Sequence, residues 1–208
     1  MPILGDRRKT YWERHAALYD RSLGPLSRPF PRMLERIGAA VQGCGSVLEV
    51  AAGTGLVTPT LSRAAGQVIA TDQAEAMVER TRVRVAVEGL SNVQCEVADV
   101  YGLRFADGQF DAAVAANLLH LLPDVPAALA ELRRVVRPGG VLVLPTFCHA
   151  QTVRSHVVSY LAALTGFPGQ RRLSDERLQR LLRDAGLQPG PVEIIDGLIP
   201  IGYVEARV

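Results

Sequence analysis

The sequence predicts a single α/β domain around a doubly wound, mostly parallel sheet of seven strands. Three observations lead to this fold class. Short apolar runs alternate with helical patterns from residue 46 to residue 147. One run, residues 110–116, is continuous and made mostly of small apolar side chains, which is typical of a parallel strand buried on both faces. The chain has 208 residues, 48% of them hydrophobic, which suits one core and is short for two.

Five strands and three helices are expected in the alternating part of the chain. The strands are expected at residues 46–51, 67–71, 93–98, 110–116 and 141–147. The helices between them are expected at residues 56–65, 75–88 and 126–136. Gly89 is expected to close the second helix, and Pro138-Gly139-Gly140 to stop the third before the fifth strand. Strands joined through helices in this way are parallel, with right-handed crossovers.

The pattern changes after residue 147. Helices are expected at residues 156–164 and 174–185, the second capped by Ser174. The last two strands, residues 192–196 and 201–208, are joined by a short connection. Parallel neighbours need a long crossover, so this pair is expected to be antiparallel.

The N-terminal part of the chain differs from the rest because it contains no strand pattern. Residues 1–40 are amphipathic and helical in pattern. They predict an N-terminal helical cap on a core of residues 41–208, the whole forming one domain of residues 1–208. We expect residues 1 to about 30 to close over a ligand as a lid, because they precede a sheet edge that is otherwise open.

Charge and cysteine content exclude several classes of protein. The 23 basic and 21 acidic side chains nearly balance, and no basic stripe is visible, so no nucleic-acid partner is expected. The three cysteines lack the spacing of a metal site, so no metal is expected. Neither a signal-peptide pattern nor the ~18–20 apolar residues of a membrane span is found. A cytoplasmic protein with reduced thiols is therefore expected.

A glycine turn and the acid after it form the strongest local pattern. Gly53-Thr54-Gly55 follows the first strand, and Asp72 ends the second strand seventeen residues after Gly55. Glycines let the backbone approach a ligand, and a carboxylate at the later position can accept the hydroxyls of a ribose. The turn alone is a weak signal, since tight turns need glycine for structural reasons. Together the two features predict a cofactor that contains a nucleoside.

A dinucleotide and S-adenosylmethionine (SAM) both contain a nucleoside. Dinucleotide sites carry the pattern G-x-G-x-x-G, whereas Ala51, Gly53 and Leu56 stand at those places here. Glu49 adds a carboxylate that would be repelled by a pyrophosphate but suits the ammonium group of SAM. The sequence therefore favours SAM.

Five segments in the right order resemble the class I SAM-dependent methyltransferases, the broad group that includes the ubiquinone/menaquinone-biosynthesis methyltransferases. They are VLEVAAGTG (residues 47–55), IATD ending at Asp72, VADV (97–100), FDAAVAANLLHLL (110–122) and RRVVRPGGVLVL (133–144). Ala51 stands where many relatives have the first glycine of the loop. The resemblance implies a Rossmann-like fold, SAM as the cofactor and S-adenosylhomocysteine (SAH) as the product.

The resemblance also implies which residues hold the two halves of SAM. The methionine half would lie against the loop after the first strand, made of Glu49, Ala51, Gly53, Thr54 and Gly55. Asn117, after the fourth strand, would offer its backbone carbonyl to the ammonium group.

The nucleoside half would lie against residues that follow the second and third strands. Asp72 would accept from the ribose hydroxyls, with Gln73 and Met77 beside it. Asp99 would accept from the adenine amino group while Val100 packs on the ring. For Met77, ordinary packing on a helix face is an equally good interpretation.

Four further residues are candidates with a structural alternative. His120 and His149 follow the fourth and fifth strands, and imidazole can serve as a base or orient a hydroxyl near neutral pH. Tyr11 and Tyr19 could cover the cofactor, as N-terminal tyrosines do in similar families. Each of the four could instead pack or hydrogen-bond within the core.

The function expected is methyl transfer from SAM to a small-molecule acceptor with apolar surface. No Asn-Pro-Pro-Tyr sequence follows the fourth strand, where enzymes that methylate nucleic-acid amino groups carry one, and residues 147–172 are mixed apolar. A SAM-binding protein that does not methylate, such as a regulator or a SAM-dependent cyclase, would carry the same motifs and stays open. A protein or RNA modifier is disfavoured, because no recognition domain or basic face is visible.

Overall fold

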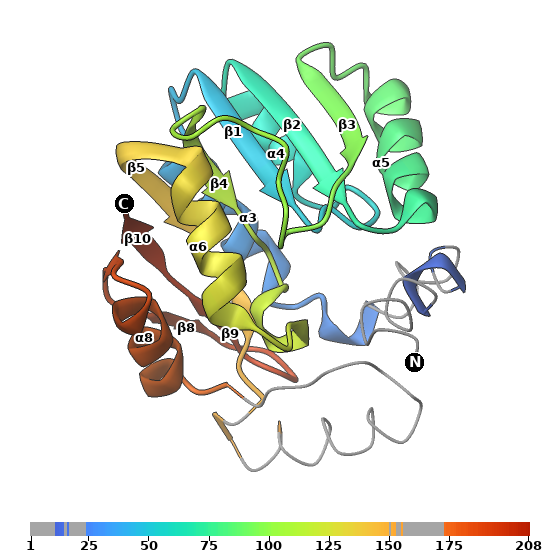
Figure 1. The fold of residues 1–208 in the computed structure, drawn as a ribbon. Helices are drawn as coiled ribbons and strands as arrows, with labels where there is room; N and C mark the ends of the chain where they lie inside the picture. Colours follow the sequence, from blue (N-terminus) through green and yellow to red (C-terminus); the bar gives the residue numbers. More distant parts are fainter. Residues whose placement is uncertain (1–10, 15, 17–23, 150, 153–154, 156–172) are drawn as a thin grey trace, which may run out of the picture.

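A computed structural model describes residues 11–14, 16, 24–149, 151–152, 155 and 173–208. Its main sheet has seven strands in the order β3-β2-β1-β4-β5-β10-β7 (Figure 1). The strands β3, β2, β1, β4 and β5 are parallel, and β10 is antiparallel to both of its neighbours. The predicted seven-stranded, mostly parallel sheet with an antiparallel strand from the C-terminal part is confirmed.

The elements have the following bounds. The main sheet contains β1 (Ser46–Val50), β2 (Gln67–Asp72), β3 (Val93–Val97), β4 (Phe110–Val114), β5 (Val136–Val143), β7 (Gln188–Pro189) and β10 (Glu205–Arg207). A second sheet, in the order β6-β9-β8, contains β6 (Thr146–Phe147), β9 (Ile201–Tyr203) and β8 (Glu193–Ile195). The helices are α3 (Phe30–Ala40), α4 (Thr58–Ala64), α5 (Glu75–Glu88), α6 (Val125–Val135) and α8 (Asp175–Asp184), with short 3₁₀ turns η1 (Gly24–Leu26) and η2 (Leu119–Leu121).

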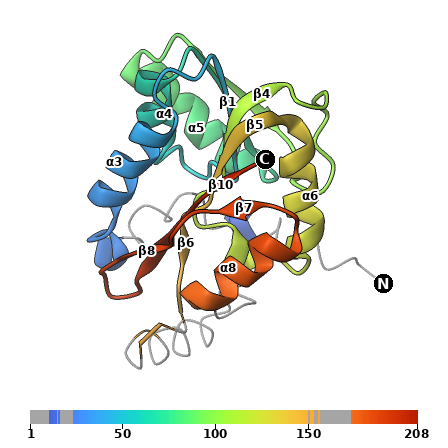
Figure 2. The same ribbon diagram turned by 90° about the vertical axis from the view of Figure 1, so that its left-hand side faces the viewer.

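Helices cover both faces of the main sheet, with α3, α4 and α5 on one face and α6 and α8 on the other (Figure 2). Successive residues of a strand point to opposite faces. Val47 therefore packs in a cluster with Ile37 of α3, whereas Leu48 packs in a cluster with Leu132 of α6. All four side chains are fully buried. Burial on both faces explains why the central strands are continuously apolar.

Helix α3 belongs to the core layer. Its side chains Phe30, Met33 and Ile37 are buried among residues of α4 and the sheet. The sequence places residues 30–40 in the N-terminal cap, because they precede the first strand. Their apolar stripe in fact completes the helix layer on one face of the sheet.

The helix ends agree with the expected caps. Gly89 closes α5 in the left-handed conformation, with a φ of 64°. The hydroxyl oxygen of Ser174 accepts from the backbone N–H of Arg177 at 3.3 Å and so caps α8. The helix expected at residues 156–164 lies outside the described residues. Within the part of the chain that the structure describes, no helix is long and apolar enough to cross a membrane.

The strand expected at residues 141–147 divides between the two sheets. Pro145 separates β5 from β6, and it has no N–H to continue a ladder. The strand expected at residues 201–208 divides in the same way at Val204, whose carbonyl accepts from the backbone N–H of Leu144 at 2.9 Å. The expected antiparallel pairing of the last strands is confirmed for β8 and β9. The two-residue strand β7 is too short to have left a pattern in the sequence.

Pro138-Gly139-Gly140 lies inside β5 and not, as expected, between a helix and a strand, since β5 starts directly after α6. The pairing of β4 with β5 shifts register at this point, so the triplet forms an irregularity in the strand. A Cβ atom on Gly140 would lie 2.5 Å from Val136 Cγ1 and 2.6 Å from the carbonyl oxygen of Asp111. Only glycine fits here.

Replacing Gly140 with alanine is expected to destabilise the protein by roughly 1–3 kcal/mol, because the added methyl meets backbone that cannot move aside. Gly102→Ala is the matched control, since a Cβ atom at Gly102 has no neighbour within 4 Å. Urea unfolding followed by circular dichroism measures both. Equal stabilities of the two variants would contradict the steric argument.

Candidate functional site

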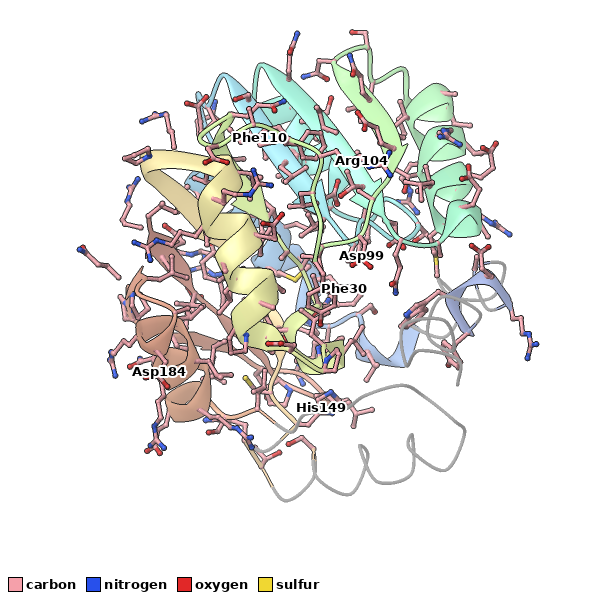
Figure 3. All side chains as sticks on the ribbon, in the orientation of Figure 1. Phe30, Asp99, Arg104, Phe110, His149 and Asp184 are labelled. Carbon is pink, nitrogen blue, oxygen red and sulfur yellow. The ribbon has the colours of Figure 1, made fainter. Side chains whose placement is uncertain are left out.

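A cleft opens at the carboxyl ends of the parallel strands. In open α/β sheets this is the edge where ligands bind. Figure 3 shows Asp99, after β3, and His149 on this side of the molecule, and Phe110, at the start of β4, near the opposite end. Of the residues predicted to bind the cofactor, seven line the cleft: Ala51, Gly53, Asp72, Gln73, Met77, Asp99 and Val100.

Seven further residues line the cleft and are not among those predicted to bind the cofactor: Trp12, Val50, Ala98, Tyr101, Leu118, Leu121 and Leu122. Val50 and Ala98 lie at the ends of strands that were predicted, so the position of each strand end was a usable signal. The three leucines belong to an apolar run that is typical of a core segment, and Leu118 and Leu122 lie in the core cluster that contains residues of α6. They make the cleft wall apolar.

Asp72 connects the glycine turn to the start of α5. Its Oδ2 accepts from the backbone N–H of Gly53 and its Oδ1 from that of Ala74, both at 3.0 Å. The side chain is buried, with 8% of the residue exposed at the cleft. Burial raises the pKa of this carboxyl, and the two N–H groups oppose the rise. Each carboxylate oxygen has a second lone pair, so the group can still accept ribose hydroxyls.

Glu49 belongs to β1, its side chain contacts Thr58 of α4, and it does not line the cleft. The Thr58 hydroxyl donates to its Oε2 at 2.6 Å, and only 2% of the residue is exposed. Burial raises the pKa of this carboxyl to about 8, and the hydrogen bond from Thr58 limits the rise. Near neutral pH Glu49 is therefore largely protonated in the absence of a cationic ligand.

Two residues without glycine's freedom adopt the left-handed conformation at this edge. Ala51 follows β1 and Asn117 follows the neighbouring strand β4, each with a φ of 54°. Such conformations are strained for an L-residue and concentrate at functional sites. Glycine adopts a φ of 54° without strain, so a glycine would suit the position of Ala51. Neither Asn117, Thr54 nor Gly55 lines the cleft.

The loop after β3 is fastened to α6. Asp99 Oδ1 accepts from the backbone N–H of Tyr101 at 3.0 Å, and the Tyr101 hydroxyl accepts from the backbone N–H of Asp124 at 3.3 Å. Asp124 in turn caps α6 by accepting from the N–H of Ala127 at 3.0 Å. The loop thus holds an exposed carboxylate beside the buried apolar side chain of Val100. A carboxylate next to an apolar surface suits a flat heterocycle that carries an amino group.

The two N-terminal tyrosines differ in what the structure says of them. Tyr11 makes an edge-to-face contact with Trp12, with ring centroids 5.0 Å apart, but only Trp12 lines the cleft. Tyr19 lies outside the described residues.

The structure brings His120 and His149 together, with ring centroids 5.2 Å apart. Both are buried, and His120 Nδ1 lies 3.2 Å from the Thr146 hydroxyl oxygen. Burial, together with the neighbouring His149, lowers the pKa of His120 well below its usual value, so its imidazole is neutral. Neither histidine lines the cleft.

Cys148 is buried, and burial raises the pKa of its thiol to about 11, which keeps it protonated. All three cysteines are free. Among the residues that the structure describes, no three of the types that ligate metals gather in one place.

A family model described as a methyltransferase domain matches residues 48–144. The chain is 30% identical over 205 residues to a nocamycin O-methyltransferase of Saccharothrix syringae, which covers 94% of this chain and 72% of that protein. It is 32% identical over 174 residues to a phosphatidylethanolamine N-methyltransferase of Cereibacter sphaeroides, which covers 83% of each. The chain spans less than half the length of the first curated relatives that it matches, 44% of one and 29% of another.

A solved structure described as a DhpI–SAH complex has the same fold. It superimposes with a TM-score of 0.75 at 26% identity and covers 96% of this chain and 94% of that one. Fold, motif order and relatives agree. The chain belongs to the class I SAM-dependent methyltransferases, and its cofactor is SAM.

Proposed function

We propose that this protein transfers the methyl group of SAM to a small-molecule acceptor with apolar surface. The observation that carries the proposal is the cleft, in which Asp72 and Asp99 follow the adjacent strands β2 and β3 with apolar side chains around them. Asp72 would accept from the ribose hydroxyls and Asp99 from the adenine amino group, while Val100 and Leu118 would pack on the ring. SAH would be the product.

The methionine half of SAM would lie against the turn at Gly53 and the residues that follow β4. The carbonyl of Asn117 would accept from the ammonium group of the cofactor. The position of Asn117 supports this role, because it follows β4 at the sheet edge where ligands of open α/β sheets bind. Glu49 would act from beneath the loop, as a buried carboxyl that a cationic ligand converts to its charged form.

Methyl transfer from a sulfonium is an in-line displacement on an activated donor. Alignment and exclusion of water supply much of the catalysis, and a base is needed only where the acceptor must lose a proton. His120 and His149 do not line the cleft, so they would serve an acceptor of that kind only where it extends beyond the cleft. His120 is neutral, so it can accept a hydrogen bond and orient an acceptor hydroxyl or amine, while His149 would take its proton.

The acceptor is proposed to be small and partly apolar, because leucines dominate the cleft wall next to η2. The two relatives methylate oxygen and nitrogen according to their names. We also propose that residues 1–208 form one domain and that the protein is cytoplasmic. The three free cysteines support the cytoplasmic location.

Incubation with methyl-labelled SAM and a panel of acceptors tests the proposal. The panel should contain phenols, quinols, amino-headgroup lipids, small carboxylates and thiols, with mass spectrometry of any labelled product. A labelled product that disappears in the Asp99→Ala variant is expected. Tight SAM binding without turnover on any member of the panel would favour a SAM-binding protein that does not methylate.

NAD(P)H is not expected to bind. Ala51 and Leu56 replace two glycines of the dinucleotide pattern. Titration of the protein into NADH, followed by nicotinamide fluorescence, checks this. Binding in the micromolar range would overturn the choice of cofactor.

A further inference from the structure

Helix α5 has no cap of its own. Its N-cap residue is Ala74, which has no side-chain acceptor, although the first N–H groups of a helix need partners. The carboxylate of Glu13 takes this place from a distant part of the chain. Its Oε1 accepts from the N–H of Glu75 at 2.8 Å and its Oε2 from that of Ala76 at 3.1 Å. A carboxylate is favoured here because the N-terminus of a helix is partially positive.

The segment that carries Glu13 also contributes to the cleft. Trp12, the preceding residue, lines the cleft together with Asp72 and Met77. Ala16 is buried in a cluster with Ala74 and Met77, and Trp12 packs against that cluster. The segment is therefore attached to the start of α5 by a polar contact and an apolar one.

The same helix start holds the residue proposed to bind the ribose. Asp72 Oδ1 accepts from the N–H of Ala74, and Glu13 accepts from the next two N–H groups. Three successive N–H groups at the start of α5 thus donate to two carboxylates, one to Asp72 and two to Glu13, which lie far apart in the sequence. Burial mainly, and the charge of Glu13 in addition, raises the pKa of Asp72. A movement of Glu13 would consequently change the pKa of Asp72, the residue proposed to bind the ribose.

We propose that Trp12 covers the nucleoside half of the bound cofactor, and that Glu13 is the positioning residue that holds Trp12 there by capping α5. The proposal rests on the function proposed above, because it takes SAM as the ligand. An indole provides a large, flat apolar surface with few rotatable bonds, which suits contact with a nucleoside. Its neighbours Asp72 and Met77 place it beside the ribose and adenine and away from the methionine end.

Trp12 is the only tryptophan of the chain, so its fluorescence reports on this contact directly. SAH and adenosine are expected to change the emission of the wild-type protein, whereas methionine alone is not. Calorimetry measures SAH affinity independently of the fluorescence. We expect Glu13→Ala to weaken SAH binding by roughly 2- to 30-fold, the range of a lost helix cap. The matched control Glu88→Ala, which removes an exposed carboxylate at the other end of α5, is expected to bind SAH as the wild type does.

The fluorescence at saturating SAH separates a positioning role from a merely structural cap. If Glu13 positions Trp12, the saturated Glu13→Ala variant should show a smaller change in emission and faster quenching by acrylamide than the saturated wild type. An equal change at saturation would overturn the proposal, as would unchanged SAH affinity in Glu13→Ala. Absence of SAH binding to the wild-type protein in calorimetry would instead contradict the proposed function, which keeps the two failures distinct.

Discussion

Replacing Asp72 with alanine is expected to weaken SAM binding by roughly 30- to 1,000-fold. The carboxylate would lose its charge-assisted hydrogen bonds to the ribose. In addition, the N–H groups of Gly53 and Ala74 would lose the acceptor that joins the glycine turn to α5. Calorimetry with SAM measures the affinity. Asp72→Asn, which keeps one oxygen acceptor, should fall between the wild type and the alanine variant.

Asp184→Ala is the control for this experiment, because Asp184 is exposed at the end of α8, away from the cleft (Figure 3). Circular dichroism at the temperature of the titration must show that each variant is folded, since Asp72 also supports the loop. A folded Asp72→Ala variant with wild-type affinity would remove Asp72 from the site.

The unliganded protein is expected to lose stability as the pH rises from about 5 to 8, with Glu49 as a main cause. The pKa of this carboxyl is 4.5 in its ordinary state and about 8 when folded. Between these values the folded protein holds a proton that the unfolded chain releases. The stabilisation is therefore complete below the lower value and is lost as the pH rises through the upper one. For one proton the free energy of unfolding changes by up to about 1.4 kcal/mol per pH unit.

Glu49→Gln removes this titration while leaving an oxygen to accept from Thr58. Urea unfolding at several pH values between 5 and 8 should give a larger fall for the wild type than for the variant. The difference between the two cancels other groups, including the neutral His120, whose contribution has the opposite sign because its pKa is lowered. Parallel curves for the two proteins would show that Glu49 is charged throughout. Glu88→Gln serves as the exposed control.

The parallel half of the sheet could be predicted because each strand there is a separate apolar run with a turn or an acid after it. Residues 46–51 and 67–71 correspond closely to β1 and β2. The strands of the C-terminal part of the chain could not be predicted in the same way. A strand that leaves one sheet and enters another, as at Pro145 and Val204, keeps one continuous strand pattern in the sequence. Only the pairing partners, which are distant in sequence, show the division.

The residues of the candidate site also differ in whether the local sequence predicts them. Asp72 and Asp99 were predictable because each ends a strand, and strand ends of a parallel sheet meet at one edge. Trp12 and Glu13 carry no local signal that links them to α5. Their partners are an apolar cluster and two backbone N–H groups, which no side-chain pattern in the sequence reveals.

The position of β10 has a consequence for the order of assembly. The strand pairs β1–β2 and β2–β3 each join strands that one helix separates in the chain, so these contacts are local and can form early. Strand β5 keeps an open edge until β10 has been synthesised and has inserted between β5 and β7. Until then an apolar strand edge is available to other chains. A chain truncated before residue 205 should therefore aggregate through β5, even though the nucleoside half of its cleft can already form.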